Sequence, residues 1–216
     1  MFAVIVAGAE LSGPLDRELL SSADLLIAAD SGADALSALS LTPHVLIGDL
    51  DSIAPLTRDA LREAGVELIE LQVSKDETDT EMALRLAVER GAGRITVLGG
   101  LGGPRLDHLL GLILLLTASW LDGVDVRLAD DRHEVFSARG EALVVGRPGD
   151  LVSLLPLTPR VEGVRTEGLA YPLHGETLFQ GATRGVSNEL LGERARVIHD
   201  EGRLLIMRYR KDGKGR

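Results

Sequence analysis

The chain has 216 residues, enough for one large domain or for an ordinary domain with a small second one. Its 33 acidic and 23 basic residues give a formal charge of −10, which argues against a protein that holds nucleic acid through phosphate contacts. The lack of cysteine excludes disulfides, thiolate nucleophiles and cysteine-bound zinc. The N-terminus has no basic signal-peptide region, and the apolar stretch 109–116 is too short to span a bilayer, so we expect a soluble, cytoplasmic protein with no membrane partner.

Short β-branched runs alternate with helical patterns over the first 135 or so residues. Strands are predicted at 2–8, 24–30, 44–49, 66–71, 94–100 and 124–130, and helices at about 14–21, 31–39, 55–64, 79–90 and 106–119. Near-continuous apolar strands separated by helices indicate an α/β fold with a parallel sheet covered on both faces. Ligands of such sheets bind beyond the carboxyl ends of the strands, where Asp30, Asp49, Gly99 and Gly100 fall.

The pattern changes after about residue 138 to short alternating segments broken by Gly and Pro, which predicts a small antiparallel β domain. We therefore expect two closely packed domains, an α/β domain over residues 1–138 and a β domain over residues 139–216. The tail, 211–216, is expected to be frayed.

Two aspartates, Asp49 and Asp51, end the apolar run PHVLIGDLDS. Their i, i+2 spacing places both side chains on one side of an extended backbone, and two like charges held close usually have a cation between them. A pair of carboxylates suits Mg²⁺, which keeps several waters or substrate phosphates as ligands. The alternative is a solvated turn in which Ser52 caps the next helix, and the motif alone favours neither.

A second acidic cluster lies in KDETDTEMALRLA, residues 75–87. Thr78 and Glu81 fit a capping box, with Thr78 as the N-cap of the helix that follows. Capping alone does not explain why Lys75, Asp76 and Asp79 gather at the site side of the sheet, so the segment favours function.

A glycine-rich segment, LGGLGGPRLDHLLG, covers residues 98–111. Four glycines between a strand and a helix allow close backbone approach to a phosphate at the helix N-terminus. Arg105 can contact phosphate oxygens with two N–H groups, while Asp107 and His108 lie in the first helical turn. The alternative is a glycine-rich turn with an ordinary N-terminal acid. Neither a Walker A motif nor a GxGxxG fingerprint is present.

Taken together, six segments resemble the thiamine pyrophosphokinase family, also called thiamine diphosphokinase. They are ADSGADAL (29–36), GDLDSI (48–53), KDETDTEMAL (75–84), GGLGGPRLDH (99–108), GLAYPL (168–173) and TRGVSNE (183–189). The resemblance implies transfer of a diphosphate from ATP to the hydroxyl of thiamine, giving thiamine diphosphate and AMP. It also implies a Rossmann-like N-terminal domain, a C-terminal β-sandwich that binds thiamine, and a homodimer with the substrate site at the subunit and domain junction.

The resemblance also implies roles for individual residues. Asp49, Asp51 and Asp79 match the catalytic aspartates that hold the metal, and Ser187 and Asn188 match the pair beside thiamine. The residues expected around ATP are Asp30, Lys75, Asp76, Thr78, Arg105, Asp107 and His108. Two positions depart from the family pattern: Pro104 is an extra residue before Arg105, so the loop must bulge, and Leu190 and Leu191 stand where eukaryotic relatives have an aromatic residue.

The expected chemistry is in-line attack on the β-phosphorus of ATP, which needs positioning and charge neutralisation rather than a covalent intermediate. Either Asp79 or Asp76 could orient the substrate hydroxyl or accept its proton. An acidic cleft would also favour the cationic thiazolium ring. Three alternatives remain: a pyrophosphokinase for another small alcohol such as a pterin, a DxD glycosyltransferase that uses a nucleotide sugar, and a non-catalytic thiamine or nucleotide sensor.

Overall fold

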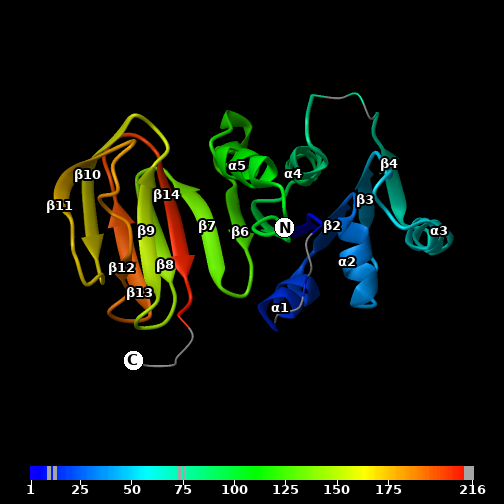
Figure 1. Ribbon diagram of the computed structural model, residues 1–216, viewed down its shortest axis with the longest axis horizontal. Helices are drawn as coiled ribbons and strands as arrows, with labels where there is room; N and C mark the ends of the chain where they lie inside the picture. Colours follow the sequence, from blue (N-terminus) through cyan, green and yellow to red (C-terminus); the bar gives the residue numbers. More distant parts are fainter. Residues whose placement is uncertain (9–10, 12–13, 73, 75, 212–216) are drawn as a thin grey trace. The chain divides into compact units, whose positions relative to one another are not determined.

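The computed structural model describes residues 1–8, 11, 14–72, 74 and 76–211 (Figure 1). The chain divides into two compact units, Met1–Asp131 and Arg132–Arg216. The division comes before β7 (His133–Ala138) instead of at the expected residue 138, because β7 pairs along its whole length with β14 (Leu204–Tyr209) of the second unit. None of the described helices has the length and hydropathy needed to cross a lipid bilayer.

The first unit contains every strand and helix that the sequence predicts for it. The strands are β1 (Phe2–Val6), β2 (Leu25–Ala29), β3 (Val45–Gly48), β4 (Glu67–Glu70), β5 (Arg94–Leu98) and β6 (Asp125–Ala129). The helices are α1 (Pro14–Ser22), α2 (Gly32–Ala38), α3 (Pro55–Glu63), α4 (Asp79–Glu89) and α5 (Leu106–Leu115), followed by a short 3₁₀ turn, η1 (Ser119–Leu121). The chain leaves α5 earlier than expected because i→i+3 hydrogen bonds tighten its last turn, as in the bond from Leu116 N–H to Ile113 O.

The six strands are parallel and lie in the order β6-β5-β1-β2-β3-β4. All five residues of β1 and of β2 are buried, as expected for strands covered on both faces. Helices α4 and α5 cover one face of the sheet, and α1, α2 and α3 cover the other (Figure 1). The fold places α4 on the opposite face from α3 because the connection from β4 to β5 runs back across the sheet, and such crossovers are right-handed.

The strand order reverses between β1 and β5. From β1 the chain proceeds through β2, β3 and β4 in one direction, and from β5 it proceeds to β6 in the other. Open α/β sheets bind their ligands beyond the carboxyl ends of the strands at such a switch point. The topology therefore directs attention to the segments that follow β1 and β5.

The second unit is a β-sandwich. One antiparallel sheet has the order β12-β9-β14-β7 and the other β11-β10-β13-β8. The remaining bounds are β8 (Glu141–Val145), β9 (Leu151–Pro156), β10 (Arg160–Glu167), β11 (His174–Phe179), β12 (Asn188–Glu189) and β13 (Arg194–Ile198). Alternate residues of β9 are buried, and the core joins Leu154 and Ile206 of one sheet to Val161 and Val197 of the other. This unit and the parallel sheet confirm the predicted fold class.

Candidate functional site

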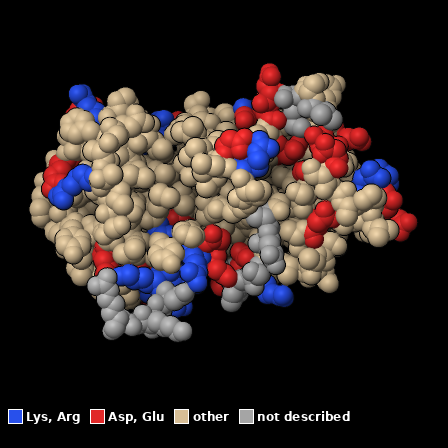
Figure 2. All heavy atoms as spheres, in the orientation of Figure 1, with Lys and Arg blue, Asp and Glu red and all other residues tan. Residues whose placement is uncertain are grey.

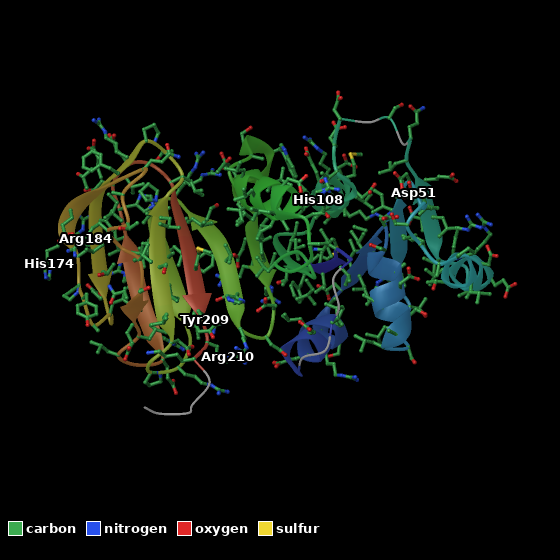
Figure 3. All side chains as sticks on the ribbon, viewed as in Figure 1. Asp51, His108, His174, Arg184, Tyr209 and Arg210 are labelled. Atoms are coloured by element: carbon green, nitrogen blue, oxygen red, sulfur yellow. The ribbon has the colours of Figure 1, made fainter. Side chains whose placement is uncertain are left out.

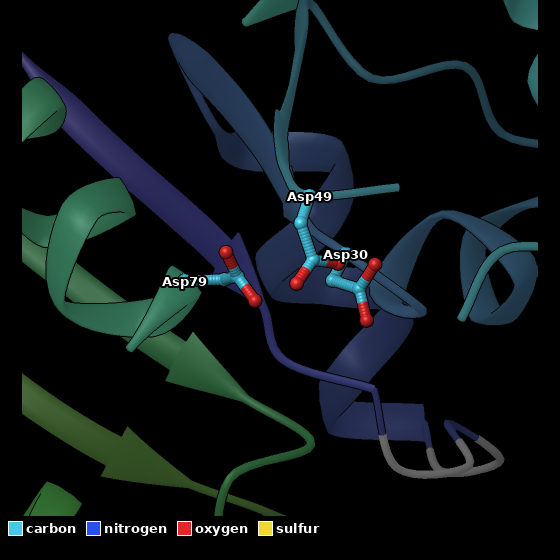
Figure 4. Close-up of side chains that lie close together, drawn as sticks. All are labelled: Asp30, Asp49 and Asp79. Atoms are coloured by element: carbon cyan, nitrogen blue, oxygen red, sulfur yellow. The ribbon is translucent and has the colours of Figure 1, made fainter. Parts of the chain in front are cut away.

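Three carboxylates of the first unit converge where strands β2 and β3 end and helix α4 begins. Asp30, Asp49 and Asp79 each offer one carboxylate oxygen, and these oxygens lie within 4.8 Å of one another (Figure 4). All three side chains are half-buried. Negative charges held this close in a partly buried place repel one another, which is the electrostatic setting of a cation site.

The backbone at the ends of β2 and β3 fixes the first two carboxylates. Asp30 adopts a left-handed conformation with φ of 46°, and its N–H donates to Ile47 O at 2.9 Å. Gly48 precedes Asp49 and passes so close to Asp30 that a Cβ at Gly48 would lie 3.1 Å from the Asp30 Cβ. Glycine at position 48 therefore allows the two strand ends to bring their aspartates together.

The third carboxylate belongs to the first residue of α4. Thr78 is the N-cap, and its hydroxyl oxygen accepts a hydrogen bond from Glu81 N–H at 3.2 Å. This confirms the predicted cap, but the Glu81 carboxylate binds Arg85 instead of the N-cap backbone. The cap therefore fixes the first turn of α4, of which Asp79 is the first residue.

The pKa and the hydrogen bonds of the Asp30 carboxyl reflect the electrostatics of the cluster. Burial raises the pKa of Asp30 above its ordinary value, and the charges of Asp79 and Asp49 raise it further against hydrogen bonds from Ser31 and Ser52. Its buried Oδ1 has no hydrogen-bond partner among the described residues. A hard cation would satisfy this oxygen and remove the repulsion, so the residues present fit Mg²⁺.

Asp51 does not belong to this group, contrary to the expectation from the DxD spacing. The backbone between Asp49 and Asp51 is not extended, because Leu50 has a φ of 63° and buries its side chain in the core. Asp51 is left exposed (Figure 3), where it accepts a hydrogen bond from the Ser52 hydroxyl at 2.9 Å. Ser52 does not cap α3, whose N-cap is Ala54. Asp30 thus takes the place that the sequence assigned to Asp51.

A cavity of about 490 Å³ lies at the switch point. Ala7 and Gly8 follow β1 on one side of it, and the glycine-rich segment that follows β5 lines another side. The remaining lining residues are Ser31, Thr78, Thr80, Glu81 and several residues of α5. The sequence missed Ser31 and Thr80 as cavity residues, although each directly follows a predicted carboxylate at a strand or helix end.

Arg105, Asp107 and His108 all line this cavity, as does the extra Pro104. Arg105 is the N-cap of α5 and donates to both carboxylate oxygens of Asp107, at 2.9 and 2.6 Å. This hydrogen-bonded pair holds the pKa of the exposed Asp107 well below its usual range. His108, labelled in Figure 3, is exposed. The glycine-rich loop, the start of α5 and the Arg105 guanidinium together can accommodate a phosphate group.

Four predicted site residues remain: Lys75, Asp76, Ser187 and Asn188. Asp76 is exposed and lies outside the three-carboxylate group, and Lys75 lies outside the described residues. In the second unit Ser187 is exposed with a φ of 62°, whereas Asn188 is buried. The Asn188 amide accepts from Tyr171 N–H at 2.9 Å and donates to Tyr171 O at 2.7 Å. Asn188 therefore holds the Tyr171 loop, and its amide is directed into the protein.

The fold and site define a class: α/β proteins with a glycine-lined cavity beyond the carboxyl ends of a parallel sheet. Comparison with known proteins identifies the family within this class. Residues 17–128 match the family model for the catalytic domain of thiamin pyrophosphokinase, and residues 133–204 match the model for its vitamin B1 binding domain. The chain belongs to the thiamine pyrophosphokinase family.

Individual relatives agree with this assignment. Thiamine pyrophosphokinase of Bacillus subtilis (strain 168) is 30% identical over 186 residues, covering 85% of this chain and 86% of that protein. The crystal structure of thiamine pyrophosphokinase from Bacillus subtilis has a TM-score of 0.87 at 26% identity, covering 98% of this chain and 100% of that one. The enzyme from Geobacillus thermodenitrificans gives a TM-score of 0.85 at 26% identity, with 99% of both chains covered.

Proposed function

We propose that this protein is a thiamine diphosphokinase, which transfers a diphosphate from ATP to the hydroxyl of thiamine and releases AMP. The observation that carries the proposal is the three-carboxylate group at the entry to α4, next in sequence to residues that line the glycine-rich cavity, in a chain that matches both domains of the family. Diphosphate transfer needs charge neutralisation and alignment, and these residues can supply both.

Asp30, Asp49 and Asp79 would hold Mg²⁺. Bound there, the ion would neutralise the phosphate oxygens of ATP and align the β-phosphorus for attack. The chain's own contribution is to keep three carboxylates in place through the left-handed turn at Asp30, the close approach at Gly48 and the helix cap at Thr78.

The phosphates of ATP would bind over the glycine-rich loop and the start of α5. The Arg105 guanidinium has two N–H groups on Asp107, which leaves its other N–H donors for phosphate oxygens. Of the two aspartates that could orient the attacking hydroxyl, Asp79 is favoured because it belongs to the carboxylate group, whereas Asp76 is exposed outside it.

Thiamine would bind through the second unit, which the vitamin B1 binding model matches. There the Asn188 amide fixes the backbone of Tyr171, whose side chain is 67% exposed. Asn188 would thus act on thiamine by positioning this loop. A homodimer completes the proposal and rests on the family resemblance alone. A cytoplasmic location stays an expectation from the sequence.

Product analysis tests the proposal. Purified protein with ATP, Mg²⁺ and thiamine should yield AMP and thiamine diphosphate in equal amounts. Formation of ADP would make it a monophosphate kinase, and no turnover with measurable ligand binding would make it a sensor. A panel that includes a pterin alcohol and a nucleotide sugar separates the remaining alternatives, and preference for either would overturn thiamine as the substrate.

A further inference from the structure

One wall of the cavity carries an acidic side chain that the phosphate chemistry does not require. Glu81 lies in the first turn of α4 and lines the cavity. Its backbone N–H is held by the Thr78 hydroxyl at 3.2 Å, so the residue has a fixed starting point on the helix. Its side chain is only 20% exposed, which limits the directions that the carboxylate can take.

Two further residues fix the Glu81 carboxylate. Arg85, one turn along α4, donates to Glu81 Oε1 from Nε at 3.1 Å and from Nη2 at 2.7 Å. The Arg85 guanidinium in turn lies over the ring of Trp120, 4.4 Å from its centroid. Trp120 thus positions Arg85, and Arg85 positions the Glu81 carboxylate. We call these three residues the column.

The column leaves one acceptor available. Both hydrogen bonds from Arg85 end on Oε1, and Oε2 of Glu81 makes no hydrogen bond to any described residue. A carboxylate facing a phosphate would repel it, whereas a carboxylate accepts strong hydrogen bonds from neutral hydroxyl groups. The part of a nucleotide that offers such donors is the ribose with its 2′- and 3′-hydroxyls, and acidic side chains commonly bind this diol in α/β folds.

We propose that Glu81 is the specificity-determining residue that accepts a hydrogen bond from a ribose hydroxyl of the nucleotide, with Arg85 and Trp120 as positioning residues. The inference rests on the proposed function, in that a nucleotide occupies the cavity. It assigns the α4 wall to the sugar and the glycine-rich loop to the phosphates. A site built to bind a hydroxyl discriminates against the analogue that lacks it, because its own polar group is then left unpaired.

Calorimetric binding of ATP, 2′-deoxy-ATP and 3′-deoxy-ATP, without thiamine, tests the assignment. We expect the wild-type protein to bind ATP about 10–100-fold more tightly than one of the two deoxy analogues. Glu81→Ala should weaken ATP binding to the level of that analogue and leave the analogue unchanged. The ratio of the affinity for ATP to that for the analogue isolates the hydroxyl, because all three nucleotides carry the same charge. A Glu81→Ala protein that keeps the wild-type ratio would overturn the proposal.

Matched variants separate positioning from structure. Glu89→Gln removes an exposed carboxylate from the far end of α4 and should leave the ratio unchanged. Arg85→Ala should reduce the ratio and Arg85→Lys should restore part of it. Trp120 is the only tryptophan, so its fluorescence should change when ATP binds and respond less to the discriminated analogue. Equal loss of all three nucleotides in Glu81→Ala would indicate only a helix-stabilising ion pair and reject the proposal. A wild-type protein that binds no nucleotide would instead refute the proposed function, and this inference with it.

Discussion

The two units use their predicted site residues in opposite ways. In the first unit, Asp30, Asp49 and Asp79 come from separate segments and turn toward one another, which creates a repulsion that a bound cation would relieve. In the second unit, Asn188 meets the needs of its amide within the protein, through Tyr171. A motif residue can therefore contact a ligand directly or build the loop that does, and its hydrogen bonds distinguish these roles.

Charge follows the same division. Residues 1–131 hold 22 acidic and 9 basic side chains, a net charge of −13, while residues 132–216 hold 11 acidic and 14 basic ones, a net charge of +3. On the face in Figure 2, acidic side chains gather over α3 and α4 of the first unit. The carboxylate group therefore lies in the unit whose overall charge attracts a divalent cation.

The largest expected effect comes from a substitution in the three-carboxylate group of the first unit. Asp49→Asn should fold normally and lower kcat by about 10²–10³-fold, because the amide keeps the shape but removes a charge that is proposed to hold the metal. Asp51→Asn is the matched comparison, and the geometry predicts a clearly smaller loss. Steady-state kinetics over a range of Mg²⁺ concentrations measure both. Equal losses would restore Asp51 to the metal site, as the DxD spacing alone suggests.

A second substitution tests the internal role of Asn188. Asn188→Ala leaves the Tyr171 N–H and C=O without their partner and should destabilise the protein by about 1–3 kcal/mol. We expect a raised KM for thiamine and an unchanged KM for ATP, together with a lower melting temperature. Ser187→Ala, on the exposed neighbour, serves as the control. An Asn188→Ala protein with altered thiamine kinetics and wild-type stability would mean direct contact with thiamine.

A smaller effect is expected from Arg105, and it tests which of the two substrates this residue contacts. Arg105→Ala should raise the KM for ATP by about tenfold, the value of one charge-assisted contact, and leave the KM for thiamine unchanged. Separate variation of the two substrates measures this. A raised KM for thiamine alone would move Arg105 from the phosphates to the other substrate.

The smallest expected effect concerns stability without metal. A raised pKa means that the ionised Asp30 is disfavoured in the folded chain, so its contribution to stability worsens as the pH rises through the unfolded and then the folded pKa. Asp30→Asn should therefore raise the melting temperature at pH 7 in a chelator, by about 2–4 °C if roughly 1 kcal/mol is recovered. The gain should vanish near pH 3, since the carboxyl is then mostly protonated. Addition of Mg²⁺ should stabilise only the wild-type protein.

The sequence predicted the elements of the fold because the central strands of the first unit are apolar throughout, as in FAVIV of β1 and LLIAA of β2, and its strands are separated by clear helical patterns. The predicted position of Asp49 and Asp79 near strand and helix ends was confirmed for the same reason. The exclusion of Asp51 depends on the burial of Leu50, which bends the backbone, and no spacing rule contains that information. The partner of Asn188 likewise lies 17 residues away and becomes visible only in three dimensions.

The central place of β1 has a consequence for how the chain folds. This strand pairs with β2 on one side and with β5 on the other, and Phe2 lies opposite Arg94 in the register. The chain between β1 and β5 is long, and closing it is entropically costly and slow. The second edge of β1 therefore stays unpaired until β5 has been made. During synthesis, an apolar strand with an open edge would persist until residue 98 has emerged. Fragments that end before β5 should therefore associate through β1, and the cavity between β1 and β5 can form only after that pairing.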